Sequence, residues 1–192
     1  MVGANTTSGQ PIERITMLQG QVRVSAVPQV EISTLLGSCI ATCLFDPELG
    51  LGGMNHFLLA APLAGTATHL TSQHYGAYLM KLLIDEMLAH GASKPRLRAH
   101  LYGGANVHPG MIEFGTVNAE FACAYLARER IPVVRKNLGG VNARRVDFRP
   151  ALGKARCRVV DNSLVSQTSI GPSGDCGNPS LAADVMKAMA IR

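Results

Sequence analysis

The segment that decides the fold is residues 40–60, which read IATCLFDPELGLGGMNHFLLA. Two apolar segments, Ile40–Asp46 and Gly53–Ala60, lie on either side of Pro47–Gly50, which is rich in turn residues. Two apolar segments joined by a short turn are typical of a β-hairpin. This part of the chain therefore predicts two antiparallel strands.

The length of the turn sets the register of this hairpin. If the loop has four residues, Asp46 lies opposite Leu51 and Ala41 lies opposite His56. Cys39 and His56 are then diagonal neighbours on one face, with α-carbons about 7–8 Å apart. A slip of one residue would place them on opposite faces.

The rest of the chain predicts a single α+β domain. Its β-structure is mixed and largely antiparallel, and two main helices pack on the outside. The first helix shows a 3.6-residue apolar period, which places Tyr78, Leu82 and Leu83 on its apolar face, and it is followed by Gly91. The second helix begins at Asn118, a good N-cap. The predicted helices are about Gln73–His90 and Asn118–Arg130, and the further predicted strands are Gln21–Ser25, Glu31–Leu36, Arg96–Tyr102, Val133–Lys136, Arg145–Phe148 and Ala155–Val160.

Length and composition predict one domain between two flexible ends. The chain has 192 residues, enough for one domain with a core. We expect a flexible N-terminus (1–17), a folded domain (18–161) and a flexible C-terminal tail (162–192), with a short terminal helix from about Asn178. No apolar run reaches about 18 residues, and the N-terminus lacks the pattern of a secretory signal, which favours a cytoplasmic protein.

Charge and cysteine content argue against a nucleic-acid-binding protein and against a protein held together by disulfides. The net charge is +5, and the densest basic group, Arg128–Arg158, would attract an acidic partner surface. Neither a basic stripe interleaved with aromatic residues nor a known module is visible, so a nucleic-acid partner is not expected. The five cysteines are scattered and odd in number, which favours free thiols.

Cys39 is the strongest candidate for a catalytic residue. It follows Gly37 and Ser38, which form a turn whose backbone N–H groups could hold a developing oxyanion. His56 can favour the thiolate form of Cys39 or take its proton. A hydroxyl from Ser33 or Thr34, on the strand before the turn, could orient the imidazole. Alternation along a strand allows only one of the two to do so.

Structural interpretations of the same residues remain open. A cysteine before an apolar run is often a small buried hydrophobe, and a lone histidine on a strand usually has a structural role. A metal site formed by Cys39, Cys43 and His56 lacks CxxC spacing and a fourth ligand, so neither a metal nor another cofactor is expected.

Several short motifs occur together in the order and spacing of one known family. They are Thr34-Leu35-Leu36-Gly37-Ser38-Cys39, Phe45-Asp46, Gly52-Gly53-Met54-Asn55-His56, Tyr102-Gly103-Gly104-Ala105, Gly115 with Asn118-Ala119-Glu120, and Gly139-Gly140. Over about Leu18 to Val160, these motifs resemble the CheD family of chemoreceptor glutamine deamidases. The resemblance implies a cysteine hydrolase, a protein-glutamine glutaminase that acts on the cytoplasmic helical region of methyl-accepting chemotaxis receptors without a cofactor.

The resemblance also implies roles for individual residues. Cys39 matches the nucleophile and His56 the histidine of the family. The third residue is a threonine six positions before the cysteine, which is Ser33 here with Thr34 beside it, so the spacing favours Ser33. The chain departs from the family pattern at Val117, at His74-Tyr75-Gly76 and at Ala143, and none of these positions is among the residues with presumed catalytic roles.

Two other functions compete with glutamine deamidation. The same cysteine and histidine would serve another amidase, a protease or a transglutaminase, because the pair specifies only acyl chemistry. The resemblance further implies binding to a CheC-type response-regulator phosphatase, so the chain could act as a regulatory adaptor. Binding alone requires neither Cys39 nor His56.

Overall fold

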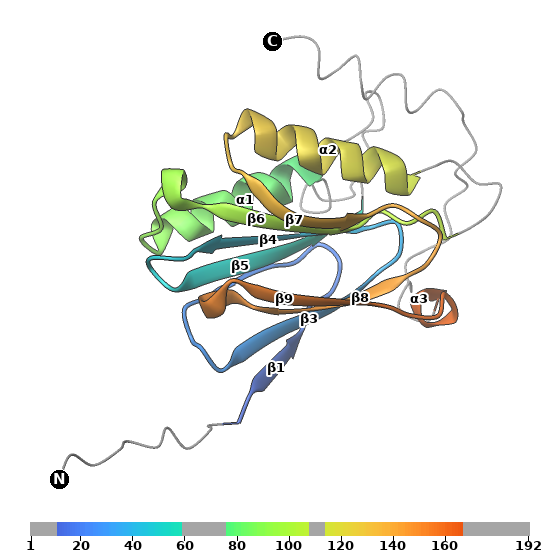
Figure 1. Cartoon of the computed structure of the whole chain (residues 1–192), viewed down its shortest axis with the longest axis horizontal. Coiled ribbons are helices and arrows are strands. Elements are labelled where there is room, and N and C mark those ends of the chain that lie inside the picture. The colour runs from blue at the N-terminus through green and yellow to red at the C-terminus, as the bar shows by residue number, and fades with distance from the viewer. Residues whose placement is uncertain (1–10, 59–75, 108–113, 167–192) are drawn as a thin grey trace.

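The computed structural model of the protein describes residues 11–58, 76–107 and 114–166. Within these residues, nine strands form two β-sheets, and two long helices lie on one side of them (Figure 1). The strands are β1 (Glu13–Thr16), β2 (Val22–Ser25), β3 (Val30–Leu36), β4 (Ile40–Asp46), β5 (Leu51–Phe57), β6 (Arg98–Gly103), β7 (Val133–Leu138), β8 (Arg144–Arg149) and β9 (Lys154–Val159). The helices are α1 (Gly76–Ala89), α2 (Phe114–Arg128) and the short α3 (Ser163–Ser166), with 3₁₀ turns η2 (Lys94–Arg96) and η3 (Pro150–Leu152).

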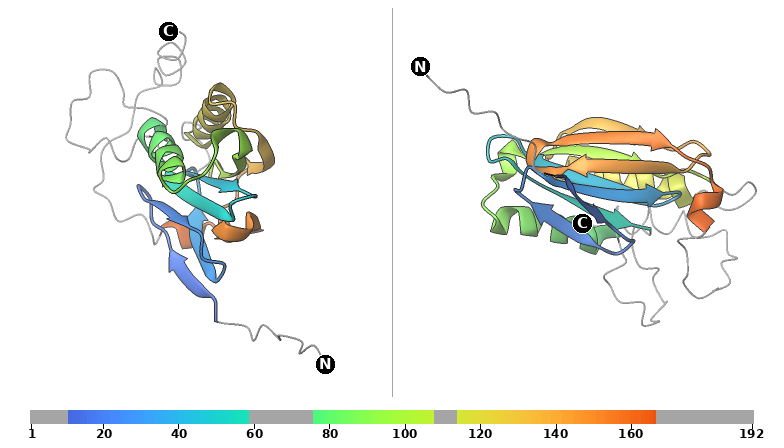
Figure 2. Two further views of the ribbon diagram at one scale, coloured as in Figure 1. Left: turned by 90° about the vertical axis from the view of Figure 1, so that its left-hand side faces the viewer. Right: turned by 90° about the horizontal axis from the view of Figure 1, so that it is seen from below.

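The elements stack in three layers. The five-stranded sheet has the order β2-β5-β4-β6-β7 and lies between the two long helices and the four-stranded sheet β1-β3-β8-β9 (Figures 1 and 2). The β1–β3 and β6–β7 pairs are parallel, and the other pairs are antiparallel. The predicted α+β class, with largely antiparallel sheets and external helices, is confirmed.

The β4–β5 hairpin has the predicted register, with Asp46 opposite Leu51. The Asp46 carboxylate closes the turn by accepting hydrogen bonds from the N–H groups of Glu48 (3.2 Å) and Leu49 (3.3 Å). The Arg96 guanidinium lies 2.7 Å from the same carboxylate and holds the pKa of Asp46 well below its ordinary value. A charged turn residue therefore fixes the loop length on which the register depends.

Alternation along β4 divides the core into two parts. Ile40 and Leu44 pack toward the helices, whereas Ala41 and Cys43 pack toward the four-stranded sheet. Each face of the five-stranded sheet is thus covered by another layer. No helix among the described residues is long and apolar enough to span a membrane.

The chain changes sheets at Gly37–Cys39. β3 belongs to the four-stranded sheet and β4 to the five-stranded sheet, so these three residues bridge the two layers. The bridge carries the candidate nucleophile to the edge of the core between the sheets, where Cys39 is partly buried.

Both ends of the described chain contain structure that the sequence did not predict. Glu13–Thr16, within the N-terminal segment expected to be flexible, forms β1. Ile15 packs into the core between the sheets. A segment of four residues is too short to show a clear alternation of apolar and polar residues, and this strand is stabilised by its pairing with β3. Ser163–Ser166, within the predicted tail, forms α3, and the helix expected from Asn178 lies outside the described residues.

The long helices are found where they were predicted, with different boundaries and faces. α1 ends before Gly91, whose φ of +91° suits a glycine, and residues 73–75 of the predicted helix lie outside the described residues. Tyr78 was expected on its apolar face but is 41% exposed, whereas Met80 and Ile84 are buried. The sheet beneath α1, rather than the helical period alone, selects which stripe is covered.

Asn118 does not cap α2, contrary to the prediction. The helix begins at Phe114, so Asn118 lies in its second turn and is 2% exposed. The capping contact comes instead from Asn106, whose Oδ1 accepts a hydrogen bond from the N–H of Gly115 at 3.1 Å. A cap supplied from a preceding loop leaves no signal at the start of the helix itself.

Candidate active site

The Gly37–Cys39 bridge is held through its carbonyl groups. The Cys39 carbonyl accepts a hydrogen bond from the N–H of Gly104 at 2.8 Å, and the Gly37 carbonyl accepts one from the N–H of Ala105 at 2.9 Å. Both donors follow directly on β6, which pairs with β4. The backbone at Cys39 is therefore fixed by the neighbouring strand.

Asn118 holds the third residue of the bridge. Its side-chain Nδ2 donates to the Ser38 carbonyl at 3.1 Å. All three carbonyls of Gly37–Cys39 thus accept hydrogen bonds, whereas no oxygen atom of the described residues accepts one from their N–H groups. The sequence singled out Asn118 as a helix cap, and only the structure gives its buried contact with the bridge.

Gly103 allows β6 to approach Cys39. It has a φ of +116°, and a Cβ atom placed there would lie 2.0 Å from the Cys39 carbonyl oxygen. No side chain fits at that distance, so the position requires glycine. In the sequence, Gly103 stands out only as part of the motif Tyr102-Gly103-Gly104-Ala105, which does not indicate this contact.

His56 lies on the same face of the five-stranded sheet as Cys39. It pairs with Ala41, whose side chain packs between the sheets, and Cys39 packs against the same core cluster. The side chain of His56 is buried, with 6% exposure. The predicted register, which places both groups on one face, is confirmed.

Thr34 fixes the tautomer of His56. Its hydroxyl donates its hydrogen to the Met17 carbonyl at 2.8 Å, so it can only accept the hydrogen bond from His56 Nδ1 at 2.9 Å. The proton of neutral His56 is then on Nδ1, and Nε2 carries a lone pair. Nε2 is buried and has no hydrogen-bond partner within the described residues. The imidazole therefore presents an unused proton acceptor in the space between the sheets.

Ser33, which the family spacing favoured, does not contact His56. Its hydroxyl donates to Asp147 at 2.8 Å on the other face of β3. Asp147 also accepts hydrogen bonds from Arg158 and Arg156. Adjacent strand residues point to opposite faces, so only Thr34 reaches the interior between the sheets. The preference for Ser33 is corrected to Thr34 as the hydroxyl partner of His56.

Burial keeps both candidate groups neutral. It raises the pKa of the Cys39 thiol to about 12, with partial compensation by the N–H of Cys39 itself. It also lowers the pKa of His56 to about 4, with partial compensation by the Met17 carbonyl. Both shifts disfavour charge in a poorly solvated site. The resting pair is therefore a thiol and a neutral imidazole rather than a thiolate and an imidazolium.

Gln19 is a site residue that the sequence did not indicate. Its Oε1 lies 3.8 Å from the Cys39 Sγ. It belongs to the turn between β1 and β2, a segment partly assigned to the flexible end. Contact with the thiol arises only from tertiary folding, so no local pattern could have found it.

The described residues offer no metal site. No group of three or more His, Cys, Asp or Glu side chains among them is placed to hold an ion. Cys43, considered together with Cys39 and His56, is a buried free thiol in the core between the sheets.

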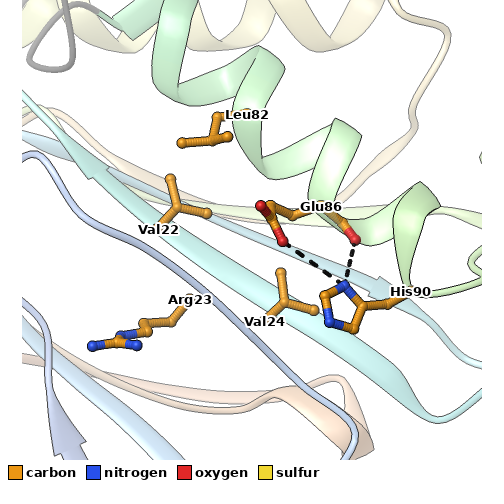
Figure 3. A pocket seen from close by; sticks show the side chains of 6 residues that line it. All are labelled: Val22, Arg23, Val24, Leu82, Glu86 and His90. Atoms are coloured by element: carbon orange, nitrogen blue, oxygen red, sulfur yellow. Dashed lines mark hydrogen bonds and ion pairs between the residues drawn. The ribbon is translucent and has the colours of Figure 1, made fainter.

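A pocket of about 290 Å³ lies between β2 and α1 (Figure 3). It is on the helix side of the five-stranded sheet, whereas Cys39 and His56 face the other sheet. None of the candidate residues lines it. The lining residues are Val22, Arg23, Val24, Leu82, Glu86 and His90.

Comparison with known proteins identifies the family to which the chain belongs. A family described as "CheD chemotactic sensory transduction" matches residues 58–159. The chain is 51% identical to the "Probable chemoreceptor glutamine deamidase CheD" of Zymomonas mobilis subsp. mobilis, over 78% of this chain and 82% of that protein. It is 46% identical to the protein of the same name from Caulobacter sp. (strain K31), over 82% and 83%, and 44% identical to that of Agrobacterium fabrum, over 81% and 85%. The chain belongs to the CheD family.

Solved structures add little to this result. The crystal structure of Bacillus licheniformis hypothetical protein YfiH aligns with a TM-score of 0.41 and 14% identity, over 72% of this chain and 62% of that one. A similarity this distant supports no inference about function.

Proposed function

We propose that this protein is a protein-glutamine glutaminase that converts specific glutamine side chains of methyl-accepting chemotaxis receptors to glutamate. One observation carries the proposal. Thr34 holds His56 with its unprotonated Nε2 free, on the sheet face that Cys39 shares. A cysteine on the same sheet face as an oriented base suits acyl chemistry, and relatives that are 42–51% identical are named for glutamine deamidation.

The first step pairs proton transfer with attack. Because the resting thiol and imidazole are both neutral, His56 Nε2 takes the thiol proton as Cys39 Sγ bonds to the glutamine Cδ. The carbonyl electrons move to oxygen, giving a tetrahedral oxyanion. The N–H groups of Gly37–Cys39, from which no oxygen atom of the described residues accepts a hydrogen bond, are the donors proposed to hold it.

The second half of the reaction releases ammonia and then the product. Imidazolium His56 protonates the leaving nitrogen, the C–N bond breaks, and a thioester remains on Cys39. His56, again neutral, takes a proton from water as the water attacks the thioester. The S–C bond then breaks, which leaves glutamate on the receptor and restores the thiol. Each turnover adds one carboxylate to the receptor and so tunes chemotactic signalling.

The charge distribution suits an acidic partner in the cytoplasm. By strand alternation, six basic residues share the outer face of the four-stranded sheet, the face seen from below in Figure 2. The two carboxylates on this face, Glu31 and Asp147, are buried beneath arginine partners. The six basic residues are Arg14, Arg145, Arg149, Lys154, Arg156 and Arg158.

A regulatory adaptor that binds a CheC-type phosphatase is the alternative function. Docking to a phosphatase needs neither a thiol nor an oriented imidazole. The hydrogen bond that His56 donates to Thr34 is therefore better explained by catalysis. Proteolysis or transglutamination by the same pair would give other products, namely a cut backbone or an isopeptide bond.

Mass spectrometry of a receptor fragment tests the proposal. We expect the purified protein to add about one dalton at selected glutamines of a chemoreceptor cytoplasmic fragment, as acyl transfer to water replaces NH₂ by OH. Ammonia is released in equal amount, without backbone cleavage. Cys39→Ala should abolish both signals while its thermal unfolding stays close to that of the wild type. Undiminished ammonia release by Cys39→Ala would refute the role of the nucleophile.

A further inference from the structure

A glutamine of this chain lies against the candidate nucleophile. The Gln19 Oε1 is 3.8 Å from Cys39 Sγ, a distance at which a thiol donates a weak hydrogen bond. The Gln19 residue itself is exposed to solvent. A side-chain amide of the kind that the proposed reaction consumes is therefore already beside the thiol, on the side of the chain that solvent can reach.

The turn that carries Gln19 is fastened to His56. The N–H of Gly20 donates to the His56 carbonyl at 2.8 Å, and the N–H of His56 donates to the Gln21 carbonyl at 3.1 Å. Gly20 has a φ of +82°, which allows the tight turn. The backbone on the C-terminal side of Gln19 is thus joined to the strand that bears the candidate base.

The backbone on the N-terminal side of Gln19 is also held. The Met17 carbonyl accepts the hydrogen bond from Thr34, and its N–H donates to the Ser33 carbonyl at 2.8 Å. Gln19 is therefore anchored on both sides, within two residues of groups that contact the site. Its backbone is held near the site, and its exposed side chain reaches Cys39.

A second glutamine in the same turn is arranged differently. The Gln21 Oε1 accepts a hydrogen bond from the N–H of Leu18 at 2.9 Å, so its amide is used within the turn. Gln19 instead extends its amide to the thiol. The two residues have the same chemistry and lie two positions apart, which makes Gln21 an internal control.

We propose that Gln19 is an internal substrate, which Cys39 of the same chain deamidates to glutamate. The proposal rests on the proposed function, because it uses the same reaction. Sγ bonds to the Gln19 Cδ, the thiol proton passes to His56, and the C–N bond breaks as His56 returns that proton to the leaving ammonia. Water then cleaves the thioester, which leaves a carboxylate at Gln19 and the free thiol of Cys39.

The geometry needs only a small adjustment for this reaction. The amide oxygen now faces the sulfur, and attack requires the carbon at about 3–3.5 Å. Rotation about the side-chain bonds of an exposed glutamine brings the carbon forward without moving the anchored turn. Reaction within one chain also avoids the entropy cost of bringing two molecules together.

Peptide mass spectrometry tests the proposal. Wild type and Cys39→Ala are expressed in the same host, purified and digested. In the wild type we expect the Gln19 side chain to be about one dalton heavier, as acyl transfer to water requires, and Gln21 to be unchanged. In Cys39→Ala both remain glutamine, which also excludes spontaneous deamidation. His56→Gln provides a second inactive protein, and thermal unfolding checks that both variants are folded.

Two further arms decide the remaining outcomes. Wild type is mixed with folded Cys39→Ala; the variant should keep Gln19 as glutamine, and its conversion by another molecule would overturn the intramolecular assignment. The same wild-type preparation is assayed on the chemoreceptor fragment. Receptor deamidation with intact Gln19 overturns this inference alone. Conversion of Gln19 without receptor deamidation supports this inference and overturns the proposed substrate.

Discussion

Removing the Thr34 hydroxyl should leave the His56 imidazole in the site but remove the hydrogen bond that orients it. Thr34→Val keeps the shape of the side chain but deletes the bridge between the Met17 carbonyl and His56 Nδ1. Both groups are buried. Each loses its partner at a cost of about 1–3 kcal/mol, so the free energy of unfolding should fall by about 2–6 kcal/mol.

The same change should slow catalysis more than it weakens substrate binding. Without the Thr34 acceptor at Nδ1, the proton of His56 can move to Nε2, and that tautomer cannot take the proton from Cys39 Sγ. General base catalysis contributes about 10²–10⁴-fold, so kcat should fall by at least about 100-fold while KM changes little. Ammonia release under conditions where the variant is folded measures kcat, and ¹⁵N chemical shifts of His56 report the tautomer.

Two matched variants complete this test. Thr34→Ser retains a hydroxyl and should keep most of the activity. Ser33→Ala loses the bond to Asp147 on the other face of β3 and should lower stability without the loss in kcat. Full activity in Thr34→Val together with a large loss in Ser33→Ala would refute the reasoning and return the role to Ser33.

Three other predictions follow from the same contacts. Burial lowers the pKa of His56 from 6.5 to about 4. Between these pH values the unfolded chain binds the extra proton, so the free energy of unfolding falls as the pH falls, by at most about 3 kcal/mol. Urea unfolding from pH 7 to pH 4 measures this slope, and a His56→Gln variant with the same slope would contradict the assignment. Asn118→Ala removes the side-chain bond to the bridge and should lower kcat about tenfold through looser positioning of the nucleophile, and unchanged kinetics would show that β6 alone is sufficient. A chain truncated after Ser166 should fold and deamidate receptor. A chain truncated after Asp161 also lacks the two hydrogen bonds of Asn162, so its free energy of unfolding should be lower by about 1–3 kcal/mol in thermal or urea unfolding. Equal stability of the two truncated chains would argue against a structural role for Asn162.

The relation between Cys39 and His56 could be predicted because it is local. They lie on neighbouring strands joined by one turn, and loop length sets the pairing. Turn residues and apolar segments are visible in sequence, so the register followed from counting. The strands other than β1 and both long helices were predicted for the same reason, because apolar periodicity, capping residues and turn residues are local features of the sequence.

The hydroxyl partner could not be settled in the same way. Ser33 and Thr34 differ only in which face of β3 they occupy, and that choice depends on where the second sheet packs. The burial that keeps the thiol and imidazole neutral is also a property of the space between the two sheets. A motif records residue types and spacing but not solvent exclusion.

The sequence alone determined the family resemblance, the hairpin and the choice of Cys39 and His56, because local spacing encodes them. Only the tertiary structure decided that Thr34 orients His56, that Asn118 and Gly103 support the bridge, and that Gln19 reaches the thiol. These contacts join segments far apart in the chain. They form only when the two sheets stack, and the physical reason is that side-chain direction and burial are set by the neighbouring layer.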